Sequence, residues 1–204
     1  MGLLSSSAAV TRYLVNGKLE DPVLETIRNG LEKRTIMEYG SESQEKAVGW
    51  TSLERPYLPD LSGSSFVVGP HIVFSLRIDK KTLPSKVVKM QCTIDMERRK
   101  AETGRDFLSK EEKKQIREHV ELVLYSRIPA TPNVYDILWN VEENMLWLFS
   151  TQGAVKEELE ALFFESFGVS LIPLFPFTEA ELTCGLGESD LDRLSTVSPA
   201  LFVE

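Results

Sequence analysis

Two pairs of short β-rich runs are each separated by only a few turn-forming residues. The four runs are residues 65–68, 71–78, 134–139 and 145–149. Gly69-Pro70 separates the first pair, and the polar stretch 140–144 separates the second. Such spacing is typical of β-hairpins, whose strands pair antiparallel. The sequence therefore predicts antiparallel sheet, which argues against a doubly wound parallel fold.

Four other segments carry the signals that begin and end helices. The predicted helices run from Asp21-Pro22 to near Ile36, from Pro84 to about Thr103, from Ser109 to Pro129, and from Thr151 to Gly168. Ser109 and Glu112 have the spacing of a capping box, which opens the third helix. Asp21 and Thr151 are expected to cap the first and the last. Gly104 and Gly168 stand where glycine commonly ends a helix.

Three further runs predict strands, and together the elements fix the fold class. These runs are residues 11–18, 45–53 and 169–174. The order β-α-β-β-β-α-α-β-β-α-β predicts an α+β fold with mixed, largely antiparallel sheets, hairpins and packed helices. We expect one α+β domain over residues 1–177, with a basic helical segment at 84–127. An acidic C-terminal tail follows over residues 178–204.

Charge is segregated along the chain, although the net charge is only −8. Residues 1–70 are net −2. Residues 71–130 hold 14 of the 23 cations against 9 carboxylates, which makes them net +5. Residues 131–204 hold 2 cations and 13 carboxylates, which makes them net −11. This segregation indicates a local basic surface and an acidic region able to compete with it.

Most of the cations within residues 71–130 lie in or beside the two helices predicted there. They are Lys80, Lys81, Lys86, Lys89, Arg98, Arg99, Lys100, Arg105, Lys110, Lys113, Lys114 and Arg117. A helical pair with such cations can follow a phosphate backbone, since each neutralised phosphate releases counterions. A solvated helix face explains the composition equally well. Aromatic residues do not alternate with the cations, so base stacking has little support.

Signatures of catalysis and of metal binding are largely missing from the sequence. There is no GxSxG, Walker A, GxGxxG or HExxH pattern. His71 and His119 are expected to be structural or surface residues, and Cys92 and Cys184 lack zinc or disulfide spacing. We therefore predict no catalytic residue, no metal and no cofactor. One alternative is a two-metal nuclease site, whose carboxylates would be Asp60, Asp79, Asp95 and Glu97.

Several short motifs together resemble one known family. The motifs are Gly49-Trp50, Leu76-Arg77, Leu83-Pro84, Val87-Val88-Lys89, Gly104-Arg105, Lys110-Glu111-Glu112-Lys113-Lys114, the Leu-x-x-Arg ending at Arg127, Trp139, Ser150, Phe167-Gly168 and Ile172-Pro173-Leu174. In order and spacing, over roughly residues 10–176, they resemble the RdgC family. These are bacterial recombination-associated proteins that are also labelled exonucleases, and this chain is similar to a short form.

The resemblance implies non-sequence-specific DNA binding and an influence on RecA-mediated recombination. Longer members form a ring-shaped homodimer whose basic inner surface surrounds duplex DNA, and we expect this shorter chain to have no counterpart of their C-terminal portion. The matching cations are Arg77, Lys89, Arg105, Lys110, Lys113, Lys114 and Arg127. With Arg98, Arg99 and Arg117 of the basic segment, they are the DNA-binding candidates.

The sequence thus predicts a DNA-binding protein of the cytoplasm and nucleoid, without catalysis. It shows no export signal and no apolar run that could span a bilayer. Helices within residues 84–127 would hold phosphates of double- or single-stranded DNA and read no base edge. Two alternatives stay open: a metal-dependent exonuclease, and a protein-interaction module whose acidic tail binds a basic partner. The tail, net −5, is expected to compete with phosphate at low salt.

Overall fold

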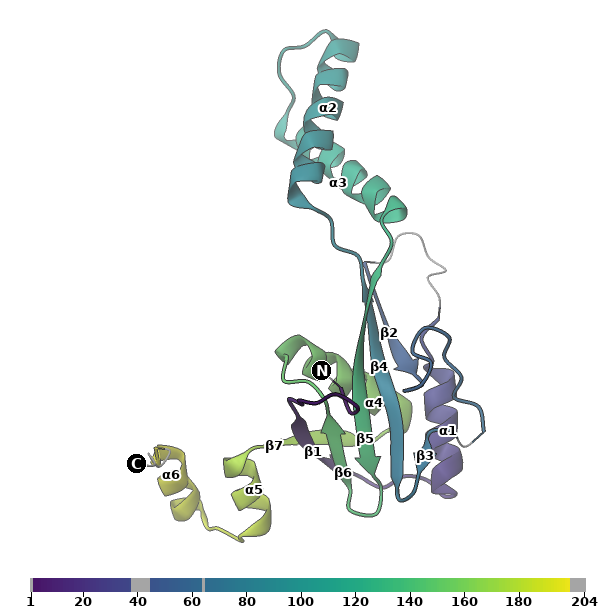
Figure 1. Cartoon of the computed structure of the whole chain (residues 1–204). Coiled ribbons are helices and arrows are strands. Elements are labelled where there is room, and N and C mark those ends of the chain that lie inside the picture. The colour runs from purple at the N-terminus through teal and green to yellow at the C-terminus, as the bar shows by residue number, and fades with distance from the viewer. Residues whose placement is uncertain (1, 38–44, 64, 199–204) are drawn as a thin grey trace. The chain divides into compact units, whose positions relative to one another are not determined.

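The computed structural model describes residues 2–37, 45–63 and 65–198. Within these residues the chain forms seven strands and six helices (Figure 1). The strands are β1 (Thr11–Asn16), β2 (Lys46–Thr51), β3 (Val67–Val68), β4 (His71–Lys80), β5 (Thr131–Asn140), β6 (Met145–Leu148) and β7 (Ser170–Leu174). The helices are α1 (Val23–Lys33), α2 (Ser85–Thr103), α3 (Lys110–Arg127), α4 (Gly153–Phe167), α5 (Pro176–Thr183) and α6 (Glu188–Thr196).

The strands form one sheet in the order β2-β4-β5-β6-β1-β7, with β3 paired to β4 (Figure 1). Strand β1 pairs antiparallel with both β6 and β7, so that Tyr13 lies opposite Leu146 on one side and Pro173 on the other. Strands β3 and β4, like β5 and β6, form the two predicted hairpins. The α+β prediction with antiparallel sheet is therefore confirmed.

The order of the elements from β1 to β7 is the predicted one, but some helix boundaries differ. Helix α1 begins after Pro22 and α4 after Gln152, in neither case with a side-chain cap, so the caps predicted at Asp21 and Thr151 are wrong. Helix α1 also ends earlier than predicted. Trp50 N donates to Arg34 O at 2.9 Å, and this bond draws the chain out of the helix towards the sheet.

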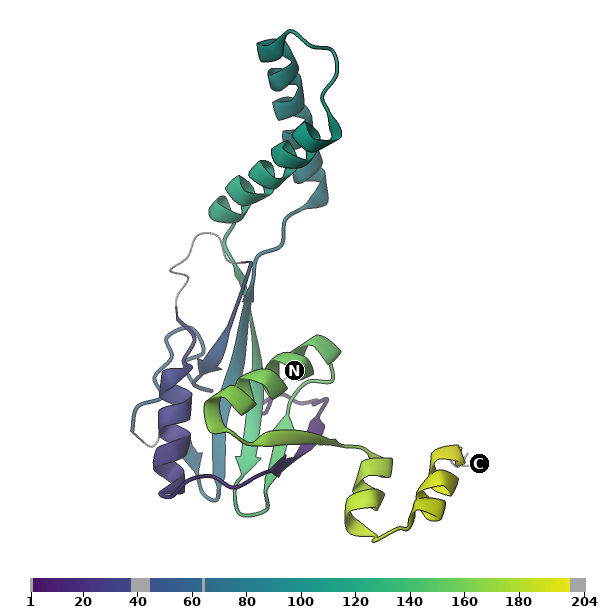
Figure 2. The ribbon, with the colours of Figure 1, turned by 180° about the vertical axis from the view of Figure 1, so that it is seen from behind.

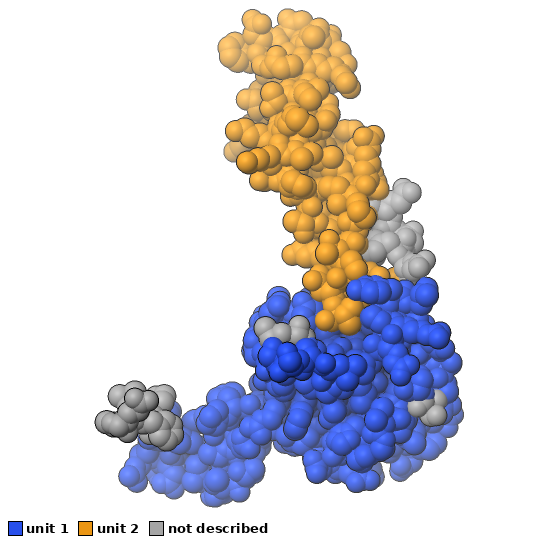
Figure 3. Space-filling view, in the orientation of Figure 1, with its two compact units in different colours: residues 1–35, 50–76, 135–204 blue, residues 36–49, 77–134 orange. Residues whose placement is uncertain are grey.

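The chain divides into two compact units (Figure 3). Unit 1 comprises Met1–Thr35, Trp50–Leu76 and Tyr135–Glu204, and unit 2 comprises Ile36–Gly49 and Arg77–Val134. The boundary falls within β2, β4 and β5. Both units belong largely to the segment predicted as a single domain. The limits 1–177 and 178–204 stay a prediction.

Unit 1 is built around aromatic side chains between its sheet and the helices α1 and α4, which lie on one face (Figure 2). The Phe167 ring lies 5.3 Å from the Trp139 ring, 6.1 Å from the Trp50 ring and 4.7 Å from the Phe163 ring, between centroids. Trp50 Nε1 donates to Ser166 Oγ at 2.8 Å. Helix α4 is therefore fixed to the sheet by packing and by a partly buried hydrogen bond.

Gly30 allows α1 to approach α4 closely. A Cβ atom at this position would lie 2.5 Å from the Phe167 ring and 2.7 Å from the Ser166 carbonyl oxygen. A backbone carbonyl cannot move aside without shifting its helix. A larger residue at position 30 would therefore separate the two helices.

We expect Gly30→Ala to destabilise the protein by about 1–3 kcal/mol, because overpacking outweighs the roughly 1 kcal/mol by which alanine favours a helix. Gly153→Ala is the matched control, since a Cβ there would meet nothing within 4 Å. The control should be neutral or slightly stabilising. Thermal and urea unfolding measure both changes, and equal stability of the two variants would contradict the close packing.

Candidate nucleic-acid interface

The basic segment folds into the two consecutive helices α2 and α3 of unit 2 (Figure 1). Helix α2 begins after Pro84, which fixes its own φ and needs no amide partner. It ends at Gly104, whose φ of 63° lies in the left-handed region that favours glycine. Both predicted ends are thereby confirmed.

Helix α3 opens with the predicted capping box. Ser109 Oγ accepts from Glu112 N at 3.1 Å, and Glu112 Oε2 accepts from Ser109 N at 2.8 Å. Arg105 Nη2 also donates to Glu112 Oε1 at 2.7 Å. These hydrogen bonds to Ser109, and then to Arg105, lower the pKa of Glu112. The carboxylate therefore fixes the start of α3 and links it to the turn that precedes it.

The two helices pack through a small apolar core. Val88, Cys92 and Val120 are buried, and partly buried side chains surround them. These are Leu83, Met96, Ile116 and Leu124. Burial raises the pKa of the Cys92 thiol, so it is a packing group and a poor nucleophile. The packing fixes which faces of α2 and α3 point outward.

One groove between the helices is basic. This basic groove, of about 470 Å³, is lined by Ser85, Val88, Lys89, Cys92, Thr93, Met96, Lys113 and Arg117. Its floor is apolar, because Val88 and Cys92 are buried there. Lys89 stands on the α2 side, and Lys113 and Arg117 stand on the α3 side. Of the described residues that line it, none is acidic.

Helix α3 carries a basic stripe that continues from this groove. Lys110, Lys113, Lys114 and Arg117 follow one another at i, i+3, i+4 and i+7, which places them on one face of the helix. All four are exposed. We call these four residues the α3 stripe.

A second groove between the same helices has mixed charge. This mixed groove, of about 330 Å³, is lined by Asp95, Arg98, Arg99, Glu102, Glu112, Gln115, Ile116 and His119. Carboxylates there outnumber the arginines. Arg99 Nη1 lies 3.6 Å from Glu102 Oε2, which neutralises part of the positive charge. The predicted cations are thus divided between two unlike surfaces.

The ten predicted DNA-binding residues also differ in whether they form an ion pair. Arg105, Lys114 and Arg117 each lie within ion-pair distance of a glutamate, at 2.7, 3.8 and 2.8 Å. The cation of each pair is exposed, and surface pairs contribute about 0–1 kcal/mol, so phosphate can displace the glutamates. Five candidates form no ion pair with any described residue: Lys89, Arg98, Lys110, Lys113 and Arg127.

Arg77 differs from the other candidates because its charge is held inside unit 2. Its Nε and Nη2 donate to Asp79 Oδ1 and Oδ2 at 2.7 and 2.6 Å, and its side chain is only 13% exposed. The side chain of Asp79 is 3% exposed. This bidentate pair serves the end of β4. Arg77 offers little surface to a phosphate.

Lys81 is a structural cation that sequence reasoning counted with the basic segment. It is buried, and its Nζ donates to the Tyr125 carbonyl oxygen at 2.7 Å. That carbonyl belongs to the last turn of α3, where a positive charge is favourable. Lys81 therefore secures the base of the helical pair. Its neighbours in the sequence gave no signal of this burial.

The carboxylates considered for a nuclease are engaged in separate local contacts. Asp79 pairs with Arg77, Glu97 with Lys100 at 2.8 Å, and Asp95 accepts from Gln91 Nε2 at 3.1 Å. Asp60 belongs to unit 1. Over residues 2–37, 45–63 and 65–198, no three His, Cys, Asp or Glu side chains gather closely enough to hold a metal ion.

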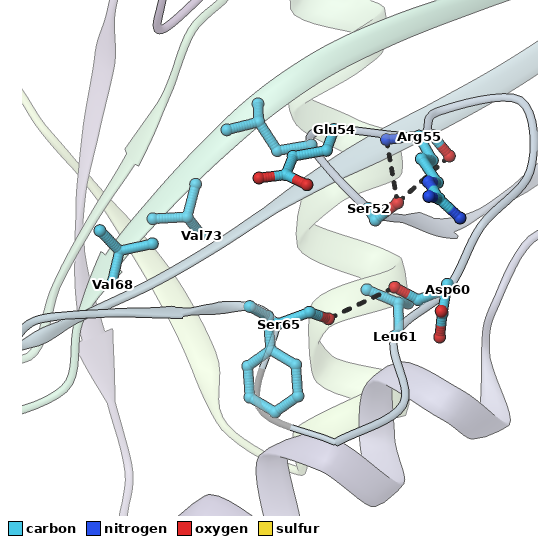
Figure 4. A pocket seen from close by; sticks show the side chains of 10 residues that line it. Ser52, Glu54, Arg55, Asp60, Leu61, Ser65, Val68 and Val73 are labelled. Atoms are coloured by element: carbon cyan, nitrogen blue, oxygen red, sulfur yellow. Dashed lines mark hydrogen bonds between the residues drawn. The ribbon is translucent and has the colours of Figure 1, made fainter.

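Unit 1 holds a pocket of about 270 Å³ beside the loop that follows β2 (Figure 4). Its polar groups bond largely to the loop itself. Arg55 N donates to Ser52 Oγ at 3.2 Å, and Ser65 Oγ donates to the Asp60 carbonyl oxygen at 3.5 Å. Hydrogen bonds from Ser62 lower the pKa of Asp60. This pocket is shaped by loop structure, and the basic groove remains the stronger candidate site.

Comparison with known proteins agrees with the resemblance seen in the motifs. In the part of the chain that the structure describes, no helix has the length and apolarity to cross a membrane. A search of curated proteins gives no match. The model of the family described as "Putative exonuclease, RdgC" matches residues 10–183. This match includes every strand, the helical pair with its basic groove, and α5. The chain belongs to the RdgC family.

Proposed function

We propose that this chain binds DNA without sequence preference, in a role associated with recombination. The observation that carries the proposal is the α3 stripe beside the basic groove. Together they present Lys89, Lys110, Lys113, Lys114 and Arg117 on one side of a helical pair. Membership of the RdgC family supports the same conclusion.

The mechanism is electrostatic. The α3 stripe extends over seven helical rises, about 10 Å, which corresponds to about three phosphates of one DNA strand. Each lysine or arginine that neutralises a phosphate releases condensed counterions. Contacts of this kind position DNA and carry no direct sequence information. The interface therefore favours backbone contacts over the reading of base edges.

A salt titration tests the proposal. We expect the logarithm of the DNA association constant to fall linearly with the logarithm of salt concentration, with a slope of about −3 to −4 for three to four phosphates on duplex DNA. Band-shift measurements on several unrelated duplexes and on single strands of equal length provide the slope. A DNA affinity that does not depend on salt concentration, or that is much higher for one sequence, would contradict backbone recognition.

The second candidate function is a DNA exonuclease, and the description of the RdgC family as an exonuclease favours it. We nevertheless expect linear DNA to remain intact when incubated with the pure protein and Mg²⁺ or Mn²⁺. A two-metal mechanism needs clustered carboxylates. The carboxylates considered above for a nuclease are instead engaged in separate local contacts. Time-resolved gel electrophoresis is the measurement, with Asp95→Asn as the control. Degradation that this substitution abolishes would establish the exonuclease instead.

We extend the proposal to two partners that the family resemblance implies. The first is a second copy of the chain in a homodimer, and the second is a functional link to RecA in the nucleoid. Sedimentation at several concentrations measures the dimer. An effect of the protein on RecA-mediated strand exchange, lost together with DNA binding, measures the link.

A further inference from the structure

We propose that helix α6 of a second copy of this chain docks in the basic groove. The inference goes beyond the proposed function, because docking needs no DNA. It rests on the shape and chemistry of two surfaces that the chain itself carries. One is the apolar-floored groove between α2 and α3, and the other is the acidic, amphipathic helix α6.

Helix α6 has an apolar face bordered by carboxylates. Leu191 and Leu194 are three residues apart and share that face, and both are half-buried. Asp190 and Asp192 flank Leu191 in the sequence, so they project about 100° to either side of it. Glu188 adds a third carboxylate in the first turn. Of the described residues in α5 and α6, none is buried.

The basic groove has the complementary arrangement. Val88, Cys92 and Met96 form an apolar floor, while Lys89 stands on one wall and Lys113 and Arg117 stand on the other. The three cations match the three carboxylates of α6. Along α2 the groove extends from Ser85 to Met96, about 16 Å of helix, which accommodates the roughly 13 Å of a nine-residue helix.

The contacts made by α5 tether α6 to unit 1. Glu179 Oε2 accepts from Arg12 Nη2 of β1 at 2.7 Å, and Thr178 Oγ1 donates to the Pro173 carbonyl oxygen at 3.0 Å. These bonds tie α5 to β1 and β7. Only residues 184–187 separate α5 from α6, and four residues span at most about 14 Å. A second copy can present its groove to α6 while this tether stays intact.

Docked α6 would occupy the cations that the proposed function assigns to phosphate. Carboxylates on a helix can therefore exclude DNA from the groove, and the exclusion should weaken as salt screens both contacts. Docking of α6 and binding of DNA would then compete for the groove. The acidic tail would then have a specific binding partner, which is the basic groove of a second copy of the chain.

A charge-exchange experiment with full-length chains tests the docking without DNA. The groove variant carries Lys89→Glu, Lys113→Glu and Arg117→Glu, and the helix variant carries Glu188→Lys, Asp190→Lys and Asp192→Lys. Each variant alone places like charges at the contact, whereas a mixture restores opposite charges. We expect the two variants to bind each other at least tenfold more tightly than either binds itself at about 50 mM salt.

Fluorescence anisotropy of one labelled variant titrated with the other measures this affinity, and thermal melting confirms that both variants fold. Arg98→Glu with Arg99→Glu, in the mixed groove, is the control and should leave self-association of the parent chain unchanged. A mixture no tighter than either variant alone would overturn the docking, as would an equal effect of the control. DNA binding retained by the groove variant, with intact heterotypic association, would instead count only against the proposed function.

Discussion

The variant Lys110→Glu, Lys113→Glu, Lys114→Glu should bind every DNA sequence about 100-fold or more weakly than the parent chain near 100 mM salt. Each phosphate contact contributes close to one unit to the salt slope, so removing three contacts at 0.1 M salt removes more than two powers of ten in affinity. The slope itself should become shallower by about 2–3. Band-shift titrations at four salt concentrations measure both quantities.

The folded state should survive this charge reversal. Lys110 and Lys113 form no ion pair with any described residue, and Lys114 loses only an exposed pair with Glu118 at 3.8 Å. A glutamate at position 110, in the first turn of α3, also interacts favourably with the N-terminal dipole of the helix. Unchanged circular dichroism and melting would show that any loss of DNA affinity comes from the interface.

A control with the same change in net charge separates local contact from the field of the whole protein. Lys18→Glu, Lys33→Glu and Arg55→Glu change exposed residues of unit 1. This variant should lose less than about tenfold, because it leaves the α3 stripe intact and salt screens charges that do not contact the DNA. If both triple variants bind alike, the α3 stripe is not the interface.

Signals confined to a few neighbouring residues predicted much of this fold. The capping box of Ser109 and Glu112 and the glycine end at Gly104 need only contacts within one turn, and the structure has both. The caps expected from Asp21 and Thr151 were wrong, although both residue types favour that position. In α1, the approach of the chain to Trp50 also set the C-terminal end. The local preference of a residue for a helix end is therefore overridden where contacts with a sheet or a core favour a different end.

The candidate site could be predicted only in outline. The basic segment was visible as a charge excess, but its division into a basic and a mixed groove depends on how α2 is rotated against α3. Val88, Cys92 and Val120 fix that rotation, and no spacing in the sequence reports it. Arg77 and Asp79 were more accessible to reasoning, because residues two apart on a strand face the same side. The burial of Lys81 arises from a contact with α3, 44 positions away.

The core of unit 1 depends strongly on Phe167, and Phe167→Ala should destabilise the protein by about 3–5 kcal/mol. The ring contacts three aromatic neighbours, and aromatic pairs add about 0.5–1.5 kcal/mol beyond area burial. Typical domains have only about 5–15 kcal/mol of stability in total, so the variant should unfold at markedly lower urea concentration. Phe164→Ala is the control from the same helix, since Phe164 is 59% exposed, and it should cost less than about 1 kcal/mol.

The double variant Gly30→Ala, Phe167→Ala tests whether one contact explains both single changes. The Cβ atom added at position 30 would meet the Phe167 ring at 2.5 Å and the Ser166 carbonyl oxygen at 2.7 Å. Removing the ring removes the first clash and leaves the second. Gly30→Ala should therefore cost less in the Phe167→Ala background than in the parent, with a coupling of about 0.5–2 kcal/mol. Urea unfolding of the four proteins gives this value, and strict additivity would show that α1 and α4 do not meet at this ring.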